Sequence, residues 1–219
     1  MPAILMVFCG SLSFSFFPEW LAFYLAFISV YELGYLLNDQ MANHREGERR
    51  RAKIFNRLEI IVFAAIRIAT FLLMTNLTKS GTSQWWLWYS VLLAVFLIHN
   101  VLKQNGLKVI TFSYLAFARF FSPIIILVDM TNVNLLGPIF VHYVVFRLIT
   151  YMDSKNLINF NRQTNFFRVI FHLLGGVFSI CLTVFTNSYL PLWISAYYIF
   201  ISAGFALLDT YFLHSVIKR

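Results

Sequence analysis

The chain has 219 residues, of which 60% are hydrophobic and only 12% are charged, and its formal net charge is +8. So few charged side chains cannot coat a soluble globule of this length, which excludes a soluble fold and favours a bilayer. The apolar residues form continuous runs, and these select helices, because only helices and closed barrels satisfy the backbone in lipid.

Apolar segments follow one another along the whole chain, each close to the roughly 20 residues that a helix needs to cross a bilayer. In chain order they cover residues 3–17, 19–37, 56–76, 84–102, 109–128, 134–152, 166–186 and 190–215. The first lacks the basic lead and the cleavage site of a signal peptide, so we interpret it as a retained span. No connector is long enough to build a soluble core. The sequence therefore predicts an all-α, multi-pass bundle of about eight transmembrane helices and a single transmembrane domain over residues 1–219.

Basic residues gather on alternate connectors of the predicted bundle. Thirteen Lys and Arg lie after the second, fourth and sixth segments or at the C-terminus, whereas the opposite connectors hold only Lys79. Because basic loops remain in the cytoplasm, both termini are predicted to be cytoplasmic. This distribution explains the net charge without a nucleic-acid partner, and part of the charge can hold anionic lipid headgroups.

Polar side chains within the predicted spans are costly and therefore informative. Glu32, Tyr35 and Asp39 recur at helical spacing, so they share a face that runs to the cytoplasmic end of the second segment. Tyr151 and Asp153 end the sixth segment on the same membrane side. Carboxylate and amide oxygens are hard ligands suited to Mg²⁺, which can in turn hold a diphosphate.

Three arginines also fall within predicted spans, where an isolated charge costs on the order of 3 kcal/mol. Arg67 is the deepest of them, and we expect it to pair with Glu32 or Glu59. Arg119 is the best placed of the three for a phosphate, and Arg147 lies one turn before the end of the sixth segment.

Other conspicuous residues have ordinary interpretations. The histidines of the predicted spans show no ligand spacing on one helix face, so we interpret them as helix-packing or interfacial residues. They are His99, His142, His172 and His214. Trp85, Trp86 and Trp88, at the edge of the fourth span, are typical of an aromatic belt.

Three ordered stretches of the chain carry a family resemblance. The second segment ends in Asn38-Asp39-Gln-Met-Ala42-Asn-His-Arg-Glu46, and the sixth ends in Asp153-Ser-Lys-Asn156-Leu157. Between them, residues 99–123 form a basic connector that continues through Arg119 to Pro123. In order, spacing and membrane side, these stretches resemble the UbiA superfamily of intramembrane prenyltransferases, whose motifs are NDxxDxxxD and DxxxD. The resemblance covers roughly residues 19–186.

The chain departs from the family pattern at acidic positions. Ala42 replaces the middle acid of the first motif, Glu46 replaces its last, and Leu157 replaces the second acid of the other motif. The acidic set has thus lost at least two carboxylates, so we expect at most one weakly held Mg²⁺. The family fold usually has nine helices, whereas about eight are expected here.

The resemblance implies a transferase that moves a prenyl group from a prenyl diphosphate to an acceptor at a cytoplasm-facing cavity. Asp39 and Asp153 would then be the catalytic carboxylates. The implied Mg²⁺ ligands are Asn38, Asp39, Glu46 and Asp153, and the implied phosphate-binding residues are Lys103, Lys108, Arg119 and Lys155. The implied partners are membrane lipid or an isoprenoid diphosphate.

Two alternatives to this reading remain. One is a non-catalytic UbiA-like membrane subunit that binds lipid or scaffolds a partner enzyme. Ala42 and Leu157 are what it predicts, but it leaves the retained Asn38, Asp39 and Asp153 unexplained. The other, a small transporter, ranks last, because the charges within the spans lie mostly toward one side.

Overall fold

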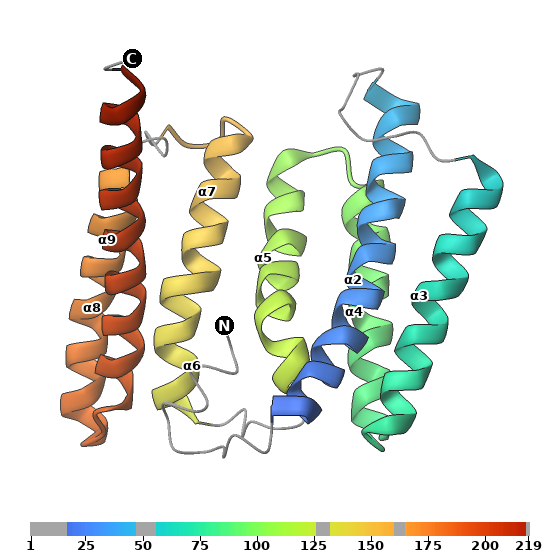
Figure 1. Cartoon of the computed structure of the whole chain (residues 1–219), viewed down its shortest axis with the longest axis horizontal. Helices are drawn as coiled ribbons and strands as arrows, with labels where there is room; N and C mark the ends of the chain where they lie inside the picture. Colours follow the sequence, from blue (N-terminus) through green and yellow to red (C-terminus); the bar gives the residue numbers. More distant parts are fainter. Residues whose placement is uncertain (1–16, 47–55, 126–131, 160–164, 218–219) are drawn as a thin grey trace. The chain divides into compact units, whose positions relative to one another are not determined.

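The computed structural model describes residues 17–46, 56–125, 132–159 and 165–217 of the chain (Figure 1). Within these ranges every regular element is a helix, which confirms the all-α prediction for them. Seven of the described helices are long and apolar enough to cross a membrane, as a multi-pass integral membrane protein requires. The predicted span over residues 3–17 lies outside the described residues except for its last position.

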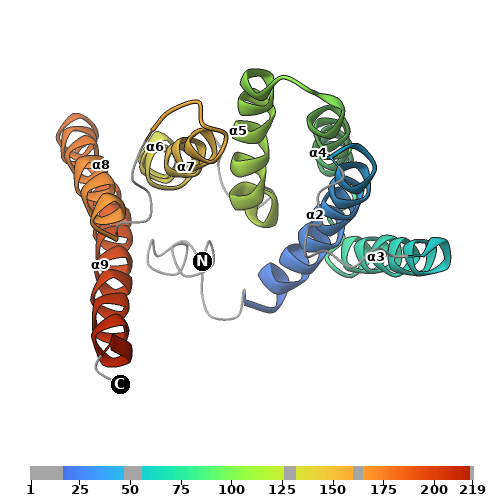
Figure 2. The ribbon, with the colours of Figure 1, turned by 90° about the horizontal axis from the view of Figure 1, so that it is seen from above.

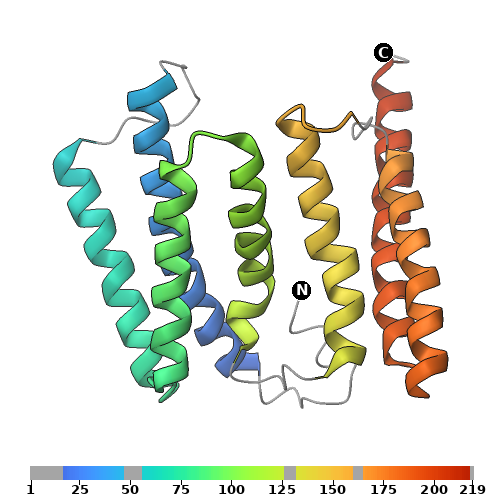
Figure 3. The ribbon, with the colours of Figure 1, turned by 180° about the vertical axis from the view of Figure 1, so that it is seen from behind.

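The chain divides into two compact units, Met1–Val128 and Asp129–Arg219. The described part of unit 1 contains α2 (Phe17–Glu46), α3 (Arg57–Leu77), α4 (Ser83–Val101), α5 (Asn105–Phe121) and the 3₁₀ turn η2 (Ser122–Ile124). These helices alternate in direction, with α2 packed on α3 and α4, and α4 packed on α5 (Figure 3). The C-terminal ends of α2 and α4 therefore share one end of unit 1 with the first turns of α3 and α5.

The described part of unit 2 begins with one continuous span built from three elements. These are α6 (Val133–Ile139), the π-helix η3 (Phe140–Val145) and α7 (Phe146–Ser154). Two long helices follow, α8 (Asn165–Thr186) and α9 (Leu190–Ile217), which pack side by side (Figure 2). The prediction of a single domain over residues 1–219 stays a prediction.

The described helix boundaries agree with the predicted segments to within a few residues, with one exception. Helix α2 continues to Glu46, well past the predicted end of its span at residue 37. Apolar character stops at the membrane edge, but Gln, Met, Ala, Arg and Glu in the next turns are good helix formers, so the helix continues. Positions 39, 42 and 46 consequently share one face of a helix.

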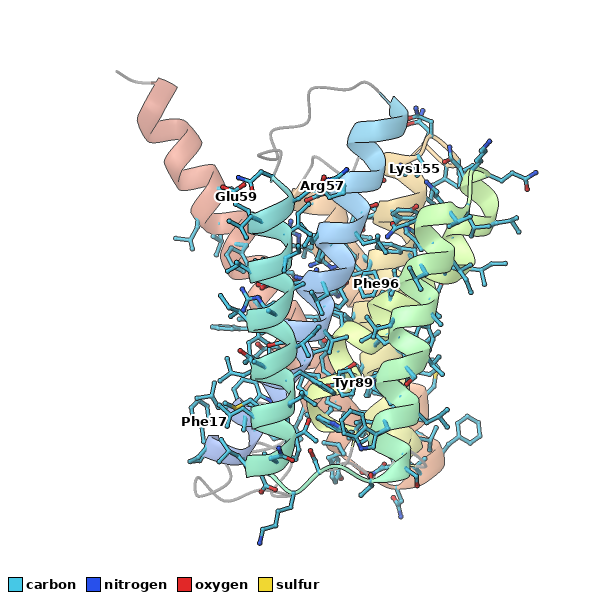
Figure 4. The ribbon with its side chains drawn as sticks, turned by 90° about the vertical axis from the view of Figure 1, so that its right-hand side faces the viewer. Phe17, Arg57, Glu59, Tyr89, Phe96 and Lys155 are labelled. Atoms are coloured by element: carbon cyan, nitrogen blue, oxygen red, sulfur yellow. The ribbon has the colours of Figure 1, made fainter. Side chains whose placement is uncertain are left out.

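Helix α3 begins with a reciprocal cap. The Asn56 side chain accepts a hydrogen bond from the Glu59 backbone N–H at 2.8 Å, and the Glu59 carboxylate accepts one from the Asn56 N–H at 2.9 Å. This arrangement satisfies two amides that the first helical turn leaves unpaired. Figure 4 shows Arg57 and Glu59 at this end of unit 1, opposite Phe17.

Trp85 belongs to the core of unit 1. Its side chain is 1% exposed, and its ring lies parallel to that of Phe71 with centroids 6.1 Å apart. The indole Nε1–H donates to Thr75 Oγ1 at 3.1 Å. The aromatic-belt interpretation is therefore wrong for Trp85, because a ring with an intramolecular partner on a neighbouring span packs inward. Trp86, which is 43% exposed, has the accessibility that a belt requires.

Helices α2 and α4 approach closely at Gly34. A Cβ atom added to Gly34 would lie 2.5 Å from the ring of Phe96, so only glycine leaves room for this ring. Phe96 also contacts Tyr31, with ring centroids 5.0 Å apart. The contact fixes the separation of the two helices midway along unit 1, where Figure 4 shows Phe96.

We predict that Gly34→Ala destabilises the protein by about 1–3 kcal/mol, because the added methyl overpacks the Phe96 ring. Thermal unfolding in detergent micelles measures the change. Gly204→Ala is the matched control, since its Cβ meets nothing within 4 Å; alanine there gains helix propensity and should not lower the unfolding temperature. Equal effects of the two substitutions would contradict the close contact.

Candidate functional site

The part of α2 that leads to the predicted site packs against α4. Tyr31 and Tyr35 both contact the Phe96 ring, with centroids 5.0 and 6.4 Å apart. Asn38 follows Tyr31 by about two helical turns, so it lies on the same side of α2. Its side chain is partly buried. The amide of the predicted site is therefore on the side of α2 that faces α4.

Asp39 lies on a neighbouring strip of α2. It follows Glu32 by about two turns, and Glu32 forms an ion pair with Arg67 of α3. Asp39 is thus on the side of α2 that meets α3, beside the first turns of α3, and its side chain is partly buried. Glu46 is the last residue of α2; its side chain lies outside the described residues, so its role as a metal ligand stays a prediction.

Lys103 and Lys108 lie at the same end of unit 1 as Asn38 and Asp39. Lys103 follows α4 and is exposed, whereas Lys108 is in the first turns of α5 and is partly buried. A hydrogen bond of 2.7 Å between His99 Nδ1 and Thr111 Oγ1 ties α4 to α5 next to them. The connector that carries Lys103 and the first turns of α5 that carry Lys108 are therefore held to the bundle, and oxygen donors and cations share one end of the unit.

Arg119 is at a different level from the two lysines. It follows Lys108 by about 16 Å along the axis of α5. Its guanidinium lies over the Tyr31 ring of α2, with 5.7 Å between Cζ and the ring centroid. Within unit 1 the structure thus brings Arg119 to the middle of α2, and it does not bring it to the level of Lys103 and Lys108.

Asp153 and Lys155 end α7 in unit 2. Lys155 is the C-cap of the helix, and its Nζ lies 5.9 Å from the centroid of the Tyr151 ring. Asn156 then adopts a left-handed conformation with φ of 56°, and the Leu157 N–H donates back to the Met152 carbonyl at 3.0 Å. This is a common way to end a helix.

The turn at Asn156 interrupts the helix between positions 153 and 157, the two acidic positions of the second motif. In a continuing helix, Asp153 and position 157 would share a face, but the left-handed residue between them turns the chain away. Leu157 is 43% exposed. The helical register that would place position 157 beside Asp153 therefore ends at Asn156.

The predicted partner of Arg67 is confirmed as Glu32. Their side chains form an ion pair between α2 and α3, and the Arg67 guanidinium also lies 4.9 Å from the centroid of the Phe63 ring. Glu59, the other expected partner, instead caps α3 through Asn56. The pair neutralises two charges that would otherwise stand alone within spans.

The donors in unit 1 are suited to one type of metal binding. Mg²⁺ keeps several waters and takes one or two carboxylates together with substrate phosphates, so Asn38 and Asp39 fit an ion shared with a diphosphate. They do not form a closed protein cage. Among the described residues, no three or more His, Cys, Asp or Glu side chains gather in a group that could hold a metal ion.

One polar cluster of the described part of unit 2 was not predicted from the sequence. His142 and His172 face each other with 3.1 Å between their Nδ1 atoms. They are 30 residues apart in sequence, and no spacing rule connects them. The signal for this cluster in the sequence is the presence of imidazoles in apolar spans. That signal does not separate a paired cluster from the helix-packing residues that we predicted.

Comparison of the chain with protein-family models, curated proteins and solved structures gives no match. The resemblance to the UbiA superfamily accordingly stays a prediction that depends on the motifs. The geometry of the site residues is the remaining guide to function.

We predict that the Glu32–Arg67 pair is energetically coupled. Glu32→Gln and Arg67→Gln should each lower the free energy of unfolding by about 1–3 kcal/mol, because each leaves the other charge without its partner in a partly exposed site. The double variant should lose less than the sum of the two. Denaturation of the four proteins in the same detergent measures the coupling, and strictly additive losses would rule it out.

Proposed function

We propose that the chain is a divergent UbiA-like intramembrane transferase, which moves a prenyl group from a prenyl diphosphate to an acceptor at the cytoplasmic face of the membrane. The observation that supports this most is the shared end of unit 1. Asn38 and Asp39 end one span there, Lys103 lies on the connector between α4 and α5, and Lys108 lies in the first turns of α5. Oxygen donors for Mg²⁺ and cations for phosphate thus come from separate elements to the same level.

Asp153 and Lys155 are the corresponding carboxylate and cation of unit 2, at the end of α7. Four candidate spans separate Asp39 from Asp153 along the chain, and an even number of crossings returns a chain to the same membrane face. The excess of basic residues on the connectors of that face assigns it to the cytoplasm, together with both termini.

The proposed chemistry is heterolysis of the allylic C–O bond, with the bonding electrons leaving on pyrophosphate. A bound Mg²⁺ would neutralise charge on the departing group. In unit 1, Asn38 and Asp39 would orient the diphosphate through that ion, and Lys103 and Lys108 would contact its free oxygens; the family resemblance implies the role of a further Mg²⁺ ligand for Asp153. The acceptor then supplies an electron pair to the allylic carbon and loses a proton.

The remaining cations would act around this leaving group. Arg119, deeper along α5 beside Tyr31, would draw the diphosphate inward, and the family resemblance implies a phosphate-binding role for Lys155. Such preorganised charge is the main contribution that a site of this kind makes to rate. The apolar side chains of the spans would surround the prenyl tail.

A second candidate is a non-catalytic membrane subunit that binds lipid or scaffolds a partner enzyme. The observation that favours it is the end of α7, where Asn156 turns the chain and Leu157 replaces an acid. Ala42 removes another carboxylate from the face of α2 that carries Asp39. A scaffold would keep the bundle without needing either ligand.

We predict that the purified protein releases pyrophosphate from a prenyl diphosphate in the presence of Mg²⁺. Asp39→Asn and Asp153→Asn should each lower the rate about 100-fold, by the loss of leaving-group stabilisation. Glu19→Gln is the control, because it removes the same charge at the opposite end of α2. Release no faster than that of the Asp39→Asn, Asp153→Asn double variant would end the transferase proposal and leave the scaffold.

We also predict the sidedness of the connectors. In a chain with Cys9 and Cys181 replaced by alanine, Gln104→Cys should react with an impermeant maleimide only from the cytoplasmic side, and Gly81→Cys only from the other side. Both sites are exposed, and a Cβ at Gly81 makes only ordinary contacts of 3.5 Å or more. The reverse labelling pattern would contradict the proposed orientation.

A further inference from the structure

A chain of hydrogen-bonding side chains joins η3, α8 and α9 in unit 2. His142 Nδ1 lies 3.1 Å from His172 Nδ1, and His142 Nε2 lies 2.6 Å from Ser195 Oγ. Ser195 Oγ then donates to Ser179 Oγ at 2.5 Å. None of these four side chains is more than 5% exposed. A polar cluster so well enclosed within spans is expensive unless each member has a partner.

Gly175 and Tyr198 pack closely against this cluster. A Cβ on Gly175 would lie 2.5 Å from Cε1 of His142, so glycine is what allows the ring to reach α8. The Tyr198 ring of α9 stacks on His142 with centroids 5.0 Å apart, and lies 5.4 Å from His172. His142 itself sits in the π-helix η3, and π-helical turns are frequent at functional positions.

Two placements of the hydrogens satisfy this chain of side chains, because a serine hydroxyl carries one hydrogen and can donate in either direction. When Ser195 donates to Ser179, His142 donates from Nε2 to Ser195, and its bare Nδ1 accepts a hydrogen bond from the Nδ1–H of His172. When both hydroxyls donate the other way, His142 Nδ1–H donates to a bare Nδ1 of His172. In either placement one of the two facing Nδ1 atoms is bare, and every contact has one donor and one acceptor.

The same geometry limits how many protons the pair accepts. One extra proton can enter at Nε2 of His172 and leave the contact between the rings unchanged. With two extra protons, both facing Nδ1 atoms carry hydrogen, and two N–H groups would point at each other across 3.1 Å. The contact cannot survive that state.

Other titratable or charged groups adjoin the pair on each packed element. Arg168, one turn before His172 on α8, is close enough for its charge to act on that ring. Tyr198 faces both rings from α9. Tyr143 follows His142 on η3, and the Arg147 guanidinium lies 5.8 Å from its ring centroid.

We propose that His142 and His172 form a proton-sensitive joint between η3 and α8. The joint is closed while at least one of the facing Nδ1 atoms is bare, and it opens when both carry a proton. Because η3 continues into α7, opening would free the helix that ends at Asp153. The joint is a property of unit 2 and does not depend on the proposed transferase activity.

The test compares the pH dependence of unfolding in the full chain and in a His172→Asn variant. Asparagine places an amide near the position of the imidazole Nδ1 and can either donate or accept, so it preserves the contact without titrating. The wild-type protein cannot take up two extra protons at this pair and keep the 3.1 Å contact, whereas its unfolded chain can protonate both imidazoles. Its stability should therefore fall as the pH is lowered from about 7.5 to about 5, through the ordinary titration range of histidine.

We expect His172→Asn to lose at least half of the wild-type drop in unfolding temperature between these two pH values. His99→Asn is the matched control, because His99 Nδ1 also makes a hydrogen bond, but to the hydroxyl of Thr111. An extra proton on His99 does not break that contact, so the control should keep the wild-type pH dependence. Identical pH dependence in all three proteins would overturn the joint.

A second measurement covers the case in which His172→Asn does not fold. Imidazole ¹⁵N spectra of the wild-type protein at about pH 7.5 should show a proton on one of the two facing Nδ1 atoms and none on the other. Spectra in which both Nδ1 atoms carry protons while the fold persists would refute the proposal. Stoichiometric binding of added Zn²⁺ between the two Nδ1 atoms would also refute it, since both would then serve as metal ligands.

Discussion

Lipid offers no partner to a polar side chain, so a polar group within a span is costly unless it finds one in the protein or reaches water. Several contacts between helices in this chain follow that constraint. Glu32 and Arg67 join α2 to α3, and the hydroxyl of Thr75 receives the indole N–H of Trp85 between α3 and α4. In unit 2 the imidazole of His142 bonds to side chains of both α8 and α9. Polar pairs, with close approaches such as that at Gly34, specify which helices are neighbours.

The same helix that makes these contacts also carries the candidate site. Along α2, Tyr31 and Gly34 contact Phe96 of α4, and Glu32 pairs with Arg67 of α3. Asn38 lies about two turns beyond Tyr31, on the side of α2 that faces α4. Asp39 lies about two turns beyond Glu32, on the side that faces α3. The helix continues past the apolar span, so the two side chains are presented from a regular helix whose packing has already been fixed. In this way the C-terminal part of α2 holds polar groups at a membrane edge in a defined orientation.

Much of this architecture was predictable, because hydropathy and helix length are strong local signals. The described spans and the pairing of Arg67 with an acidic residue followed from the sequence. The continuation of α2 to Glu46 did not, because hydropathy reports the membrane edge and not the end of the helix. The inward position of Trp85 and the contact between His142 and His172 depend on neighbours distant in sequence, and the turn at Asn156 depends on a single left-handed residue. The level of Arg119, in contrast, follows from the helical rise once α5 is known to be continuous.

The proposed site requires the C-terminal end of α2 to lie beside the connector that follows α4, and cross-linking tests this most directly. In a chain without Cys9 and Cys181, Asn38→Cys and Lys103→Cys are introduced together and treated with a short bismaleimide in native membranes. We expect rapid intramolecular cross-linking, slowed by added prenyl diphosphate, and none when Glu19→Cys replaces Asn38→Cys. Single labelling at both positions without a cross-link, or equal cross-linking from position 19, would contradict this arrangement.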